Sequence, residues 1–111
     1  MPATYEDAQL MMQIVRWGTE MGLEDAMSVI WAEDFEPDSA EMSNPAVGKV
    51  LGYGEFLGTF VKQGILDRGL VIDMWWVEGI WARVGPAALK LRANAGEPRL
   101  YENFEALATS A

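Results

Sequence analysis

The stretch from residue 45 to residue 63 constrains the fold most, because apolar side chains surround most of its circumference if it is helical. At about 100° per residue, these side chains cover an arc of roughly 220°. A helix on the surface carries a narrower apolar stripe, so we expect this helix to lie at the centre of the fold. Asn44 and Pro45 are typical of a helix N-terminus, and Gly64 is typical of a C-terminus. The apolar positions are Val47, Val50, Leu51, Tyr53, Phe56, Leu57, Phe60 and Val61.

Two helices are expected before this stretch. Thr4 and Asp7 resemble a capping box, in which each side chain bonds the backbone of the other residue. The helix that follows would end at Gly18 or Gly22. A second helix begins directly afterwards at Leu23, where apolar residues recur at i, i+3, i+4, i+7 and i+8.

Two or three helices are expected after the central one. Residues 70–84 are apolar nearly all round, so a buried strand competes with a helix in the first part of this run. A helix is favoured, because Asp67 is a good cap and strict alternation is missing; a break within residues 76–79 stays open. Residues 85–86 (Gly-Pro) predict a kink or a new helix start, and residues 100–108 predict a terminal helix.

These patterns predict an all-α fold, a compact bundle of five or six helices in one domain over residues 1–111. A chain of 111 residues is a suitable length for a single domain. The acidic stretch 33–43 is expected to be a loop, and no linker divides the chain.

The chain contains no histidine and no cysteine. These two types supply most near-neutral acid–base groups, nucleophiles and transition-metal ligands, so we expect no catalytic residues, cofactor or metal site. The start of the chain lacks a signal-peptide pattern, and the apolar run 70–81 is short and broken by two acids. We therefore expect a cytoplasmic protein that does not enter the membrane.

The net charge of −9 is concentrated in the first third of the chain. Residues 1–41 hold ten acids and one base, Arg16, whereas the rest of the chain holds seven of each sign. Such a field repels nucleic acid, so no nucleic-acid partner is expected, and it would attract a basic protein partner. A solvated acidic face that keeps the protein soluble is the simpler interpretation.

Part of the sequence resembles a known family. The segments Gly-Ile-Leu-Asp-Arg-Gly-Leu-Val at 64–71, Trp81, Leu-Arg at 91–92 and Pro-Arg-Leu-Tyr-Glu-Asn-Phe-Glu-Ala-Leu-Ala at 98–108 look like a family of small helical bacterial proteins without a known function. The resemblance covers about residues 45–108 and implies an all-helical fold without catalytic residues. Some members of that family carry an N-terminal membrane helix, whereas the N-terminal segment of this chain is acidic.

Four glycines lie in the central stretch, although each is unfavourable inside a helix by about 1 kcal/mol relative to alanine. Gly54 and Gly58 fall within the apolar arc, where they would let a neighbouring backbone come close. Gly48 and Gly52 fall on the polar side. They are either tolerated there or mark a face that a partner chain or ligand approaches.

Asp73 stands within the most apolar run, where an unpaired buried charge would be unfavourable. We expect its carboxylate either to point at a cavity or to pair with an arginine. The candidate arginines are Arg68, Arg83 and Arg92.

Trp75, Trp76 and Trp81 are the remaining candidates for a functional surface. Adjacent helical residues point about 100° apart, so one small bundle does not readily bury all three. Tryptophan is enriched at the centres of protein interfaces. These residues therefore indicate an interface with a second copy of the chain, a ligand that stacks on them, or a core that holds all of them.

The sequence leads to two functional hypotheses. The first is a non-enzymatic helical protein that homo-oligomerises or acts as a protein-interaction module, with the contact supplied by residues 45–81. The second is a small-molecule binding protein or carboxylate-dependent enzyme with an aromatic-lined pocket around Asp73.

Overall fold

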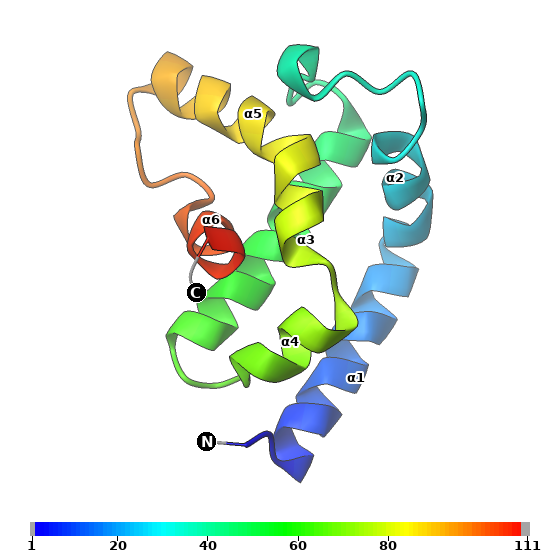
Figure 1. Cartoon of the computed structure of the whole chain (residues 1–111), viewed down its shortest axis with the longest axis vertical. Coiled ribbons are helices and arrows are strands. Elements are labelled where there is room, and N and C mark those ends of the chain that lie inside the picture. Colours follow the sequence, from blue (N-terminus) through cyan, green and yellow to red (C-terminus); the bar gives the residue numbers. More distant parts are fainter. Residues whose placement is uncertain (1, 110–111) are drawn as a thin grey trace.

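The computed structural model describes residues 2–109, which form six α-helices and one short 3₁₀-helix, with no strand among them (Figure 1). The elements are α1 (Tyr5–Glu20), α2 (Leu23–Ile30), η1 (Pro37–Ser39), α3 (Pro45–Lys62), α4 (Arg68–Met74), α5 (Val77–Ala95) and α6 (Glu102–Thr109). The predicted all-α bundle of five or six helices is confirmed.

Helix α3 is the centre of the bundle, as its wide apolar arc predicts. It contacts α2, α5 and α6, and in Figure 1 it runs through the middle of the molecule. Its fully buried side chains, which all belong to the predicted arc, are Val47, Val50, Leu51 and Leu57. Phe56 also belongs to the arc, but it lies at its edge and is 51% exposed.

Helix α6 crosses α3 at two glycines. A Cβ atom added to Gly54 would meet the ring of Phe104, and one added to Gly58 would meet the backbone carbonyl of Asn103. The prediction that Gly54 and Gly58 admit a close neighbour is therefore confirmed, and the neighbour is α6 of the same chain.

The helix starts follow the local signals in the sequence. Thr4 and Asp7 make a complete capping box at α1. The side chains of Asn44 and Asp67 accept hydrogen bonds from backbone N–H groups of α3 and α4, at 3.0 and 2.9 Å. Gly22 separates α1 from α2 with a left-handed backbone (φ 82°), so the alternative end of α1 at Gly18 is wrong.

The helical run predicted over residues 70–84 is broken at Trp75 and Trp76. Trp75 has an extended backbone between α4 and α5, one residue before the predicted range for a break. Helix α5 then continues through Pro86 without a new start. Figure 1 shows α5 changing direction about half-way along its length, in agreement with the predicted proline kink.

One cluster of buried apolar side chains, drawn from all six α-helices and from the loops, forms the core. Within residues 2–109, every helix is too short or too polar to cross a membrane.

Candidate functional site

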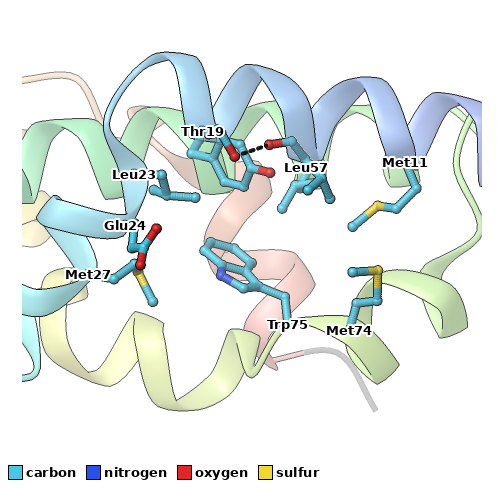
Figure 2. Close-up of a pocket in the computed structure, with 11 residues that line it drawn as sticks. Met11, Thr19, Leu23, Glu24, Met27, Leu57, Met74 and Trp75 are labelled. Atoms are coloured by element: carbon cyan, nitrogen blue, oxygen red, sulfur yellow. Dashed lines mark hydrogen bonds between the residues drawn. The ribbon is translucent and has the colours of Figure 1, made fainter.

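A cavity of about 280 Å³ lies between α1, α2, α3 and the junction of α4 with α5 (Figure 2). Most of its lining is apolar, and its exposed residues, Val15, Thr19, Glu24 and Met74, mark the mouth. We call this cavity the Trp75 pocket. It is lined by Met11, Val15, Gly18, Thr19, Leu23, Glu24, Met27, Tyr53, Leu57, Met74 and Trp75.

Helix α1 supplies the first wall from residues 11, 15, 18 and 19, whose spacing places them on one helix face. Gly18 brings α3 close to this wall. A Cβ atom on Gly18 would lie 3.0 Å from Cε1 and 3.1 Å from Oη of Tyr53. Because the glycine leaves this space free, the phenol of Tyr53 reaches α1 and its hydroxyl donates to the carbonyl of Ile14 at 3.0 Å.

Helix α2 supplies the second wall. Leu23, Glu24 and Met27 line the pocket, and the left-handed turn at Gly22 starts α2 directly after α1. Trp31 lies one helical turn beyond Met27, so the apolar face of α2 continues past the end of the pocket.

Trp75 occupies the middle of the pocket. In Figure 2 its indole projects between two ends, one where Met11 faces Met74 and one formed by Leu23, Glu24 and Met27. The indole meets Tyr53 edge to face, with centroids 5.5 Å apart, and stacks on Phe104 at 5.7 Å. Packing against these two rings therefore fixes the orientation of the indole.

Three of the side chains that line the pocket carry oxygen atoms. The hydroxyl of Thr19 donates to the carbonyl of Val15 at 3.2 Å, the dashed line in Figure 2. Burial raises the pKa of the Tyr53 hydroxyl above its ordinary value, so it stays protonated at neutral pH and donates to Ile14. Glu24 contributes an exposed carboxylate. This arrangement can hold an apolar molecule and accept hydrogen bonds from a polar group attached to it. None of these three side chains forms a nucleophile–base pair.

The three candidate tryptophans have different environments. Trp75 lines the pocket. Trp81 is half-buried against Phe104, with centroids 5.1 Å apart. Trp76 is 67% exposed and stacks on Trp31, which is 38% exposed, at 5.4 Å and an interplanar angle of 6°. The core thus does not hold all the indoles.

The expectation for Asp73 is wrong. Asp73 is exposed, does not line the pocket, and forms none of the ion pairs found in residues 2–109. The reason is that α4 has seven residues and fully buries only Val71, and Asp73 lies in its exposed last turn. Arg92 pairs with Glu105 at 2.8 Å instead, and the guanidinium of Arg83 lies 5.0 Å from the ring centroid of Trp31.

Gly48 and Gly52 lie on α3 away from the pocket. A Cβ atom on Gly52 would meet nothing within 4 Å, and one on Gly48 would only touch Met42 at 3.8 Å. Neither glycine is required by a neighbour within the described chain. No group of three or more carboxylates converges among residues 2–109 in the way a metal ion would require.

Sequence reasoning missed the α1 and α2 side of the pocket. Its residues lie on the same helix faces that pack the core, so periodicity assigns them to the core as well. The one available signal was methionine, since three of the lining residues, Met11, Met27 and Met74, are of this adaptable type.

Comparison with known proteins identifies the family alone. The chain matches no curated protein and no solved structure. One family model matches residues 5–110, which is nearly the whole chain and extends well beyond the segments that carried the resemblance. The chain therefore belongs to the family described as "Domain of unknown function (DUF4760)".

Proposed function

We propose that this protein is a non-enzymatic binding protein that holds a small apolar molecule in the Trp75 pocket. The observation that carries this proposal is a cavity of about 280 Å³ whose apolar lining comes from four parts of the chain. Its volume lies just below the range of roughly 300–1,000 Å³ of most ligand sites, and well above the roughly 150 Å³ cavity that accepts benzene. The pocket therefore suits a molecule of one or two rings or an equivalent aliphatic chain.

A titration with naphthylmethanol, a neutral two-ring probe, tests this function by calorimetry. About a dozen non-hydrogen atoms at roughly 0.4 kcal/mol each give a Kd of a few hundred micromolar. Val15→Trp places an indole in the pocket mouth and should weaken binding at least about tenfold. Met12→Trp is the matched control, because Met12 lies three residues before Val15 on α1, is 71% exposed and does not line the pocket. No binding to the wild type, or equal binding by the two variants, would contradict the function.

Homo-oligomerisation is a second candidate function, favoured by the exposed stack of Trp31 on Trp76. Trp76 falls within the segment 45–81 that the sequence assigns to an interface, and Gly48 and Gly52 leave room for a second chain on α3. Light scattering at tens of micromolar should give a dimer mass. Trp76→Ser should shift it towards the monomer, whereas Ile65→Ser, at another exposed apolar residue, should not. A monomeric wild type would exclude this candidate.

A basic protein partner and a cytoplasmic location stay predictions of the charge and composition. A pull-down with basic partners that is insensitive to salt would count against the first, and fractionation of cells that express the protein tests the second.

A further inference from the structure

We infer that the Trp75 pocket is selective for cationic ligands, and that Glu24 binds their charged group. The expected ligand is an organic amine, protonated at neutral pH, attached to an apolar body of one or two rings. This inference rests on the proposed function, because it assigns the chemistry of the molecule that the pocket holds.

The position of Glu24 is the first argument. In Figure 2 its carboxylate lies at one end of the pocket beside Leu23 and Met27, away from the end where Met11 faces Met74. A ligand whose apolar body lies along Trp75 would therefore bring one end to this carboxylate.

The carboxylate of Glu24 is available to a ligand. The three ion pairs found in residues 2–109 involve other acids, Glu41, Glu102 and Glu105. Lys49 extends towards the α1–α2 turn at Gly22 and does not line the pocket. Glu24 is also solvent-exposed, so a ligand can reach its carboxylate from the mouth of the pocket.

The two hydroxyls of the pocket reinforce this polarity. Thr19 and Tyr53 both donate their protons to backbone carbonyls of α1. What they offer to a ligand is therefore oxygen lone pairs, as Glu24 does. An ammonium group carries donors alone and matches such acceptors, whereas a carboxylate or phosphate ligand would find no cationic donor in the lining and only the neutral indole N–H of Trp75 beside these three side chains.

The electrostatic field of the acidic N-terminal third also favours a positively charged ligand. Helices α1 and α2, two walls of the pocket, belong to residues 1–41, which hold ten acids and one base. The base, Arg16, is exposed on α1 and does not line the pocket. A cation approaching the mouth is thus attracted by the whole N-terminal third as well as by Glu24.

Three probes with one apolar body test the inference by calorimetry: naphthylmethylamine, naphthylmethanol and naphthoate. An ion pair at an exposed rim corresponds to a difference of up to about fivefold in Kd. We expect the amine to bind about three- to fivefold more tightly than the alcohol, and naphthoate to bind more weakly than both. In about 0.5 M salt the amine and the alcohol should become nearly equal.

Glu24→Gln should remove most of the advantage of the amine, so that the ratio of the Kd values of the alcohol and the amine, both measured on the same variant, falls towards one. Asp25→Asn is the matched control, because Asp25 is the next residue on α2, is exposed and does not line the pocket. If the alcohol binds and the amine is no better, or if both variants reduce the preference equally, the role of Glu24 is wrong and the binding function stands. If none of the three probes binds, the proposed function itself is wrong.

Discussion

The carboxylate of Glu55 caps a helix from another part of the chain. Its Oε1 atom accepts hydrogen bonds from the backbone N–H groups of Asn103 and Phe104, both at 3.0 Å, at the start of α6. These N–H groups have no partner within α6 itself, and a negative charge at a helix N-terminus is favourable. Tyr101, the residue before α6, has a left-handed backbone (φ 58°).

Loss of this cap should destabilise the whole protein. We expect Glu55→Ala to lower the free energy of unfolding by about 1–2 kcal/mol, the usual effect of removing a helix cap. Glu55→Gln keeps an acceptor oxygen without the charge and should have an intermediate effect. Urea denaturation followed by circular dichroism measures both. An unchanged midpoint in Glu55→Ala would mean that water replaces the carboxylate at no cost.

Asp7 links two helix starts and should make stability depend on pH. Its carboxylate accepts from the backbone N–H of Thr4 at 2.8 Å and from that of Asp67 at 3.0 Å. These bonds, chiefly the one from Thr4, hold the pKa of Asp7 below its ordinary value of 3.8. Since the folded state favours the charged form, the stabilisation is fully present above pH 3.8 and is lost as pH falls through the lowered pKa.

Asp7→Asn removes this pH dependence. The variant should therefore be less stable than the wild type at neutral pH, and the difference in unfolding free energy should shrink as the pH is lowered below 3.8. Urea titrations at a series of pH values measure the difference. A gap that stays constant down to the lowest pH would show that the carboxylate charge does not stabilise these two helix starts.

At the scale of the elements, two glycines of α3 should respond in opposite ways to the same substitution. Gly58→Ala should destabilise by about 1–3 kcal/mol, because the new methyl group meets the backbone of Asn103 and forces α6 away. Gly52→Ala should stabilise by about 0.5–1 kcal/mol, because open space surrounds it and alanine favours the helix. Thermal unfolding compares them. If the protein dimerises and Gly52→Ala destabilises the dimer, a second chain occupies that side of α3.

The helix boundaries could be predicted where one or two neighbouring residues determine them. The caps at Thr4, Asn44 and Asp67 bond to backbone groups two or three residues away, so the sequence contains the whole interaction. The capping of α6 by Glu55 joins residues 48 positions apart. In the sequence Glu55 appears only as a polar position of α3, and no local pattern indicates its partner.

Burial at the edges of elements was harder to predict, and the candidate site depends on it. Phe56 and Asp73 were both expected inside, yet both are exposed, because the packing of neighbouring helices decides which edge of an apolar arc is covered. Trp75 was identified as a candidate from the density of indoles around it. Its partners in the pocket come from α1 and α2, and their convergence depends on how those helices pack.

At the scale of the whole molecule, the uneven charge acts over the full length of the fold. The molecule measures 40 × 28 × 21 Å. At an ionic strength of about 0.01 M the Debye length is about 30 Å, so every acid of residues 1–41 repels the others, whereas at about 0.15 M it is about 8 Å and only near neighbours interact. Among these acids, Glu41 alone forms an ion pair within the described residues, with Lys90 at 3.5 Å.

Added salt should therefore stabilise this protein by screening self-repulsion in the folded state, where the acids are closest. We expect the Tm to rise between about 0.01 and 0.3 M sodium chloride. Glu36→Lys, in the exposed acidic loop, should raise the Tm at low salt and reduce its dependence on salt, whereas Glu97→Lys, an exposed acid outside the N-terminal third, should change that dependence less. A Tm that falls with salt would mean that attractive pairs such as Arg92–Glu105 outweigh the repulsion among the N-terminal acids.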